Sequence, residues 1–311
     1  MKLTTDRIKE GILHERRMVR DLAARYFSEA YSPDPDVMPK VIEAIETRGW
    51  ADAFNSPASF NHLAQTEDTL GWFVAELEKV GEPVNLAETD HCLNVGSIIA
   101  KAPVALLMQH ESRILGLKGL LQHHRRAVSQ RLRFAGENVD RQWEMLEAFC
   151  EQEKATRYVN EVDLGYAGRL AEAIARDGRY AEKVLDVLSQ TYEDVTDDPM
   201  SWMEPLAVEM AGEMRLEAAV PSLVERLWID ADWLREQCMD ALAKIGTDEI
   251  VRAIVERFPG SPWHCRLFAS AAMERLRSDL AVSRCLELAG TEEDWNVKDK
   301  APFHFCGGFS G

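Results

Sequence analysis

The sequence lacks the short motifs that mark many catalytic and metal sites. It has no glycine-rich phosphate loop, no G-x-S-x-G and no H-E-x-x-H. Its six cysteines form no C-x-x-C pair, so we expect reduced core residues of a cytosolic protein. No apolar run approaches about 18 residues, and the N-terminus has no apolar signal core. We therefore expect a cytoplasmic protein that is neither exported nor inserted in a membrane, with no metal ion and no cofactor.

Positive charge is also scarce. The net charge is -17, and residues after Ala155 contribute 17 Lys and Arg against 29 Asp and Glu, or -12 of that total. Because duplex binding depends on Lys and Arg that neutralise phosphates, we do not expect nucleic acid to be the main ligand. An acidic surface favours a basic protein partner or simply keeps the chain soluble.

What the sequence does contain is a repeat. Trp202, Trp233, Trp263 and Trp295 are separated by 31, 30 and 32 residues. Each of the first three is followed by an apolar helical pattern, a short break and a second such pattern. A period in this range is typical of stacked helical hairpins. We expect each tryptophan to fill the junction between successive repeats, and the alternative is a surface for an extended ligand.

One stretch matches a known repeat type. Residues 234–246 have Arg235 early in the expected first helix and Ala241 in its middle, and they end in Lys244-Ile245-Gly246. These features resemble HEAT repeats of the short kind found in bilin-lyase-like repeat proteins. The resemblance is good over 201–290 and fair over 17–48. It implies an all-α fold, a right-handed superhelix of helical hairpins (a HEAT-like solenoid).

The resemblance near the N-terminus depends on proline spacing. Apolar residues lie two, three and six positions after both Pro39 and Pro221, and proline is tolerated only in the opening turn of a helix. We therefore expect one continuous solenoid that is irregular in its middle. Its parts are an N-terminal repeat (1–50), an irregular helical segment (51–199), the main repeats (200–290) and a non-helical tail or partial cap (291–311).

A basic segment inside the acidic chain is the candidate binding site. Residues 112–136 contain no acidic residue, and their apolar residues keep helical spacing. The sequence predicts a basic amphipathic helix that docks an acidic segment of a partner protein. Its charged residues are Arg113, Lys118, Arg125, Arg126, Arg131 and Arg133. The alternative is that these charges pair with acidic neighbouring helices or are solvated.

The sequence is best interpreted as a non-catalytic scaffold or adaptor for protein–protein interaction, which binds its partner through a concave face and this basic helix. One alternative is the lyase-like enzyme or enzyme accessory that the family resemblance implies, modifying a cofactor or a partner. It would need a pocket in residues 50–160, lined by His91, Cys92, His110, His123 or His124. A second alternative is a nucleic-acid-binding solenoid centred on the basic helix.

Overall fold

The computed structural model describes residues 3–156, 158–190, 198–229 and 231–294. Within these ranges the chain is entirely helical and has no strand, as the sequence predicts. Trp295, the fourth tryptophan of the repeat, and the rest of the tail after Asp294 lie outside the described residues. The chain divides into two compact units, residues 1–136 and 137–311. The division falls inside 51–199, the segment predicted to be one irregular helical region. A single continuous solenoid stays a prediction.

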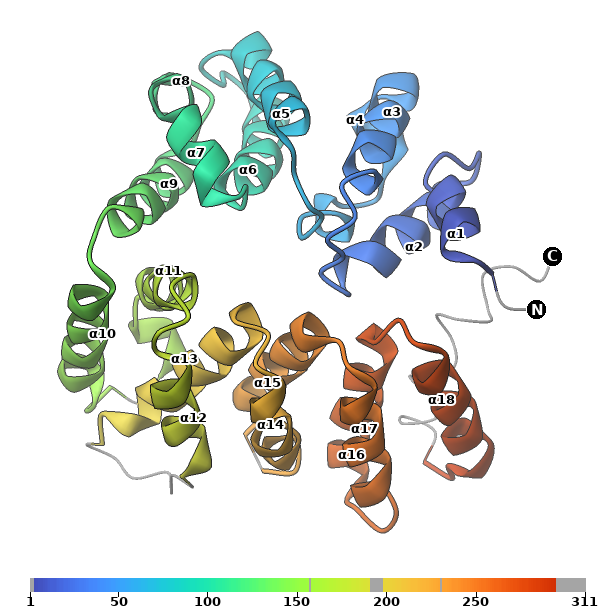
Figure 1. Cartoon of the computed structure of the whole chain (residues 1–311). Helices are drawn as coiled ribbons and strands as arrows, with labels where there is room; N and C mark the ends of the chain where they lie inside the picture. Colours follow the sequence, from blue (N-terminus) through green and yellow to red (C-terminus); the bar gives the residue numbers. More distant parts are fainter. Residues whose placement is uncertain (1–2, 157, 191–197, 230, 295–311) are drawn as a thin grey trace. The chain divides into compact units, whose positions relative to one another are not determined.

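The first unit contains nine α-helices in its described part and one 3-10 helix (Figure 1). Their bounds are α1 Thr5–Gly11, α2 Arg17–Ser28, α3 Val37–Arg48, α4 Trp50–Ala53, η1 Pro57–Ser59, α5 Glu67–Val80, α6 Leu86–Ala100, α7 Val104–Gln109, α8 Glu111–Gly116 and α9 Gln122–Ala135. Helices α2 and α3 are the pair expected over residues 17–48, and Pro39 lies in the first turn of α3.

Arg20 holds the first pair of helices to the segment that follows it. The side chain is 2% exposed. It donates to the carbonyl oxygens of Ala53 (2.8 Å), Asp52 (2.5 Å), His14 (2.7 Å) and Glu15 (2.8 Å). A buried guanidinium is stable here because its donors are satisfied by backbone acceptors at loops and helix ends.

The continuous basic helix expected over 112–136 is a wrong prediction. The structure has two helices, α8 and α9, and residues 117–121 between them are not helical. The break coincides with Gly116 and Gly119, because glycine is a poor helix former. A Cβ at Gly119 would lie 3.0 Å from the carbonyl oxygen of Gly81 and 3.2 Å from Cys92 Sγ. The chain therefore needs a residue without a side chain at this crossing.

The second unit also contains nine α-helices in its described part and two 3-10 helices. Their bounds are α10 Val139–Glu153, η2 Val159–Glu161, α11 Leu164–Ala175, α12 Ala181–Ser189, α13 Met200–Glu213, η3 Glu217–Ala219, α14 Val220–Arg226, α15 Asp232–Ile245, α16 Asp248–Arg257, α17 Trp263–Arg275 and α18 Asp279–Thr291. The six helices α13 to α18 are those that the repeat predicts.

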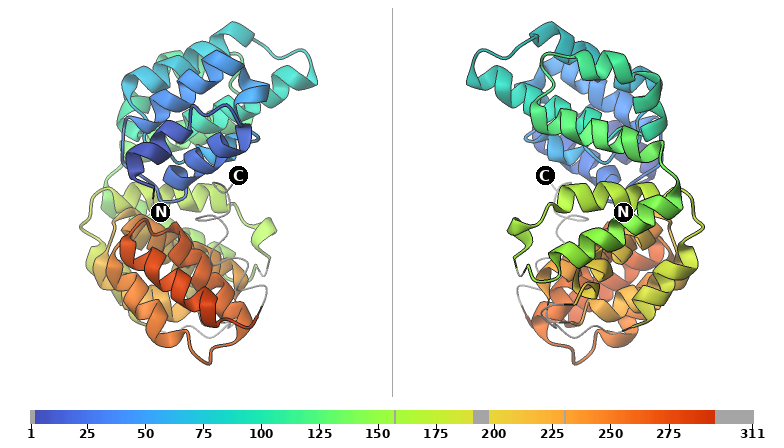
Figure 2. Two further views of the ribbon diagram at one scale, coloured as in Figure 1. Left: turned by 90° about the vertical axis from the view of Figure 1, so that its right-hand side faces the viewer. Right: turned by 90° about the vertical axis from the view of Figure 1, so that its left-hand side faces the viewer.

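Alternate helices of this unit form two rows (Figures 1 and 2). In one row α11 packs on α13, α13 on α15 and α15 on α17; in the other, α12 packs on α14, α14 on α16 and α16 on α18. The two rows meet where α12 lies on α13, α14 on α15 and α16 on α17. Gly246 ends α15 in the left-handed conformation (φ 72°), and its N–H bonds to the carbonyl oxygen of Leu242, as expected for a C-terminal glycine.

The three described tryptophans of the repeat occupy equivalent places. Trp202, Trp233 and Trp263 lie in the first turns of α13, α15 and α17. Trp202 is 5% exposed and its Nε1 donates to the carbonyl oxygen of Glu153 (2.9 Å). Its ring contacts Trp233 edge-on, with centroids 6.0 Å apart. Trp263 is 47% exposed. The first two therefore fill a junction between neighbouring helices, and the third presents an exposed face.

Candidate functional site

An open groove lies in the second unit where α10, α12 and the start of α13 come together. Its volume is about 500 Å³, within the range of small-ligand and peptide side-chain pockets. Helices α10 and α12 both pack on α13, so α13 forms the base and the other two form the walls. The lining residues are Trp143, Glu147, Ala148, Cys150, Glu151, Lys183, Asp186, Val187, Gln190, Pro199, Met200 and Met203.

The helical period brings these side chains together. On α10, Trp143, Glu147 and Glu151 follow at intervals of four, so they share one face. On α12, Lys183 and Val187 are also four apart. Each wall therefore carries both polar and apolar side chains.

An aromatic cluster occupies one part of the groove. The rings of Trp143 and Tyr180 are stacked, with centroids 4.8 Å apart and an angle of 10° between planes. Lys183 Nζ lies 4.4 Å from the centroid of the Trp143 ring, a favourable cation–π geometry. Glu147 accepts from Trp143 Nε1 (2.6 Å) and from Lys183 Nζ (3.4 Å). Asp140 accepts from the Tyr180 hydroxyl (2.7 Å). These bonds fix the wall of the groove before any ligand arrives.

Carboxylates outnumber cations in the lining. Glu147, Glu151 and Asp186 contribute three negative charges, whereas Lys183 contributes one positive charge. Glu151 is paired with Lys154 and both side chains are exposed, so this pair is screened by water. The carboxylate of exposed Asp186 forms no ion pair with any other described residue. The lining side chains therefore carry more negative than positive charge.

The base of the groove is apolar. Met203 is 4% exposed, Met200 and Pro199 are partly exposed, and Val187 on the α12 wall is 8% exposed. Methionine side chains are flexible and polarisable, so they adapt to apolar groups of different shapes. Cys150 also lies here, but burial raises the pKa of its thiol to about 12. It is a packing residue and not a nucleophile at neutral pH.

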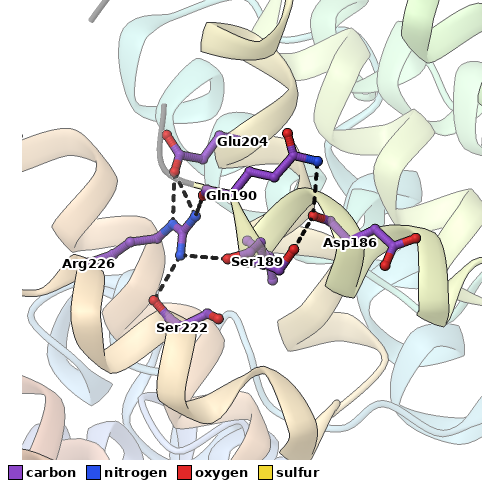
Figure 3. Close-up of polar contacts among 7 residues, drawn as sticks. Asp186, Ser189, Gln190, Glu204, Ser222 and Arg226 are labelled. Carbon is purple, nitrogen blue, oxygen red and sulfur yellow. Dashed lines mark hydrogen bonds and ion pairs between the residues drawn. The ribbon is translucent and has the colours of Figure 1, made fainter. Parts of the chain in front are cut away.

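A buried arginine supports one end of the groove (Figure 3). Arg226 is 4% exposed and its Nε donates to Glu204 Oε1 (2.9 Å). Its Nη atoms donate to the carbonyl oxygens of Leu188 (3.1 Å), Gln190 (3.0 Å) and Ser222 (3.0 Å). Leu188 and Gln190 are at the C-terminal end of α12, where carbonyl groups have no partner within the helix. Arg226 thus ties the end of the α12 wall to α13 and α14.

Glu204 is not a capping residue of α13, although its spacing from Ser201 is typical of one. The spacing Ser201-x-x-Glu204 suggests a capping box at a helix start, but α13 begins at Met200 and its N-cap residue is Pro199. Glu204 is instead paired with Arg226 in the interior, and burial raises the pKa of its carboxyl group. The apolar residues that surround Glu204 in the sequence were the signal that its side chain is buried.

The six basic residues predicted as a partner site do not form one surface. Arg131 is 7% exposed and donates to the carbonyl oxygens of Ala100 (2.6 Å) and Ala102 (2.7 Å). Arg125 donates to the carbonyl oxygens of Leu117 (2.7 Å) and Leu120 (3.1 Å). Both therefore have structural roles in the first unit, where they satisfy the carbonyl groups of loops and helix ends.

The remaining four basic residues are exposed. Arg113 forms a bidentate ion pair with Glu78, with both N–O distances 2.8 Å. The guanidinium of Arg133 lies 4.8 Å from the Phe134 ring centroid. Lys118 is exposed in the connection between α8 and α9, and Arg126 is exposed on α9. These four side chains are exposed, whereas Arg125 is partly buried and Arg131 is buried.

The histidine and cysteine side chains considered for an enzyme site are used in packing. Cys92 is fully buried, and burial raises the pKa of its thiol. His91 contacts the Trp50 ring edge-on at 4.9 Å, and burial lowers its pKa. His110 lies 3.7 Å from Glu67.

His123 and His124 form a pair on α9. Their Nε2 atoms are 3.0 Å apart, so one ring donates and the other accepts. Burial and the neighbouring His123 lower the pKa of His124 to about 4. Among the described residues no group of three or more His, Cys, Asp or Glu side chains could hold a metal ion.

The described cysteines are free thiols. All five are buried, which confirms the expectation of core residues for Cys92, Cys150, Cys238, Cys265 and Cys285. Cys306 lies outside the described part.

None of the described helices is long and apolar enough to cross a bilayer. No model of a known protein family, no curated protein and no solved structure matches this chain.

Proposed function

We propose that the protein is a non-catalytic scaffold that holds another protein. The two rows of helices in the second unit offer long exposed faces and an open groove. Such surfaces suit an extended partner better than a small substrate that must be enclosed. The groove itself contains an adaptable apolar base and charged walls, which are features of a binding surface.

The single observation that carries the proposal is a set of contacts spaced by about one repeat. Lys244 Nζ donates to Glu213 (2.6 Å), 31 residues away. Trp228 Nε1 donates to Ser261 (2.7 Å), 33 residues away. Ion pairs join Arg257 to Glu225 and Arg275 to Asp240, at separations of 32 and 35 residues. Each hairpin is therefore bound to the next, which is the arrangement that lets repeats build a continuous surface.

This spacing also supports a second proposal, that the helices of the second unit form a HEAT-like, right-handed superhelix. In that arrangement α11, α13, α15 and α17 form one face, and its polar residues include Glu213, Asp240 and Lys244. We propose the same fold for residues 17–48, where α2 and α3 form a comparable pair.

The enzyme alternative receives less support than the scaffold. The Cys92 thiol is buried with a raised pKa, and a nucleophilic cysteine needs a lowered pKa and access to a substrate. The nucleic-acid alternative depends on a basic helix, but two of its arginines are engaged with backbone carbonyl groups. We propose the exposed basic residues of this segment as a smaller secondary contact for an acidic partner segment.

The test is affinity purification of the full chain from its native cell, followed by quantitative mass spectrometry. We expect one protein to co-purify in near-stoichiometric amount. Lys118→Glu, Arg126→Glu and Arg133→Glu together test the basic surface without removing the buried arginines. Arg252→Glu and Arg284→Glu, at exposed positions on α16 and α18, are the control. The proposal fails if a small molecule co-purifies and no protein does.

A further inference from the structure

We propose that the groove between α10 and α12 binds a short segment of the partner protein in which a Lys or Arg lies next to an apolar side chain. The proposal rests on the scaffold function and adds the place and the chemistry of the contact. The groove is acidic and belongs to the second unit, so it differs from the basic segment 112–136 of the first unit that the sequence predicts as a partner site.

Charge selects a basic segment. The lining carries the carboxylates of Glu147, Glu151 and Asp186 and the single cation of Lys183. Lys183 already lies over the Trp143 ring and is bonded to Glu147, so its charge is largely committed to those groups. Asp186 on α12 forms no ion pair with another described residue, and the pair of Glu151 with Lys154 on α10 is exposed to water, so these two carboxylates are the ones that receive the cation of a partner. The chain as a whole carries -17, which attracts a basic segment over a longer range.

The apolar base selects the neighbouring side chain. Met200, Met203 and Val187 line the same groove as the two carboxylates. An apolar side chain placed there removes water from the methionines, while the adjacent cation stays near the solvated rim. A purely basic segment would leave this base uncovered, and a purely apolar one would leave the carboxylates without partners.

The groove is formed before binding. The Trp143–Tyr180 stack fixes one part of it, and Arg226 ties the end of α12 to α13 and α14. A binding surface that is already ordered loses little entropy when a ligand arrives. Nucleic acid is disfavoured because its phosphates would meet the same carboxylates.

The test begins with a random peptide library displayed against the full-length protein. We expect selected peptides to be enriched in a Lys or Arg adjacent to Leu, Ile, Met or Phe. The binding of a selected peptide is then measured by fluorescence anisotropy. We expect Asp186→Asn and Glu151→Gln each to weaken binding about fivefold, and Ala148→Trp, which fills the groove, to abolish it. Glu182→Gln, exposed on α12 outside the lining, is the matched control and leaves the affinity unchanged.

Several results would overturn this assignment. Selection of acidic peptides, absence of any selected motif, or equal binding by the Ala148→Trp variant each removes the groove as the site. Self-association in sedimentation velocity that the groove variants abolish would show that a second copy of the chain is the occupant. If a partner still co-purifies with the Ala148→Trp protein, the scaffold function stands and only the groove assignment falls.

Discussion

Glu209 is a buried carboxyl group whose ionisation opposes folding. It lies on α13 against α11, where a Cβ added to Gly168 would be 3.2 Å from both of its carboxylate oxygens. Burial raises the pKa of Glu209 from 4.5 to about 7, and Lys244 only partly offsets this effect. The nearby Glu213 and Glu172 contribute to this raised pKa. At neutral pH the side chain is therefore close to its midpoint of ionisation.

The direction of the pH effect follows from this shift. Because the folded pKa is above the unfolded one, the folded state binds more protons between pH 4.5 and 7, and stability decreases as pH rises through that window. A shift of this size corresponds to about 3 kcal/mol. Glu209 keeps part of its surface exposed, so screening by water reduces the expected effect to about 2 kcal/mol.

Glu209→Gln tests this reasoning, since glutamine resembles the protonated carboxyl group and cannot ionise. We expect the variant to be more stable than the parent by about 2 kcal/mol at pH 8 and nearly equal to it at pH 4. Urea unfolding followed by circular dichroism at several pH values measures the difference. Glu236→Gln removes an exposed carboxylate on neighbouring α15 and is the control. Equal stability of the Glu209→Gln and parent proteins at pH 8 would refute the argument.

Three further effects are expected from unfolding measurements. Gly212→Ala should lower the free energy of unfolding by about 1–3 kcal/mol, because the new Cβ would lie 2.7 Å from a backbone atom of α15. Gly290→Ala on α18 is the control, since its Cβ would meet nothing within 4 Å, and it should be neutral or stabilising. Equal effects of the two substitutions would contradict the close approach of α13 and α15 at Gly212. Arg226→Met should lower the free energy of unfolding by about 3 kcal/mol, because it leaves the buried carboxylate of Glu204 unpaired. The exposed control Arg252→Met should lower it by less than about 0.5 kcal/mol. Similar losses in the two variants would contradict a stabilising role of the buried Arg226–Glu204 pair. The first unit should lose stability as pH falls from 6.5 towards 4, because His124 has a lowered pKa in the folded state and stays neutral there, whereas the unfolded chain binds the proton. His124→Phe should remove this dependence, and a variant with the same pH profile as the parent would contradict the prediction.

The periodic part of the chain was predictable from sequence. The stripes after Trp202, Trp233 and Trp263 indicated α13 to α18, because each helix buries one apolar face and the period of 3.6 residues is visible locally. The pair over 17–48 was found by the same spacing after Pro39. A glycine in the left-handed conformation at Gly246 also has a clear local signal.

The basic segment shows where the same reasoning fails. Its apolar residues keep helical spacing through Gly116 and Gly119, so periodicity alone predicts one helix. The break arises because Gly119 lies against the backbone of Gly81, a contact between residues far apart in sequence. The burial of Arg131 depends in the same way on carbonyl groups 29 and 31 residues away.

The groove was not predicted for a related reason. Its walls and base come from α10, α12 and α13, and no local pattern states that Trp143, Lys183 and Met203 line one cavity. The spacing of Trp143, Glu147 and Glu151 was a usable signal, since it places an aromatic ring and two carboxylates on one helix face. It resembles any solvated helix face until the neighbouring helices are known.

Site-specific photocrosslinking in the native cell tests the central claim most directly. A photoreactive amino acid at exposed Ala148 lies in the groove wall, and the same residue at exposed Glu182 lies outside the lining. We predict that position 148, and not position 182, becomes crosslinked to one partner protein, at a peptide that contains a Lys or Arg beside an apolar residue. Adducts that contain only nucleic acid, or that form equally at both positions, would contradict it.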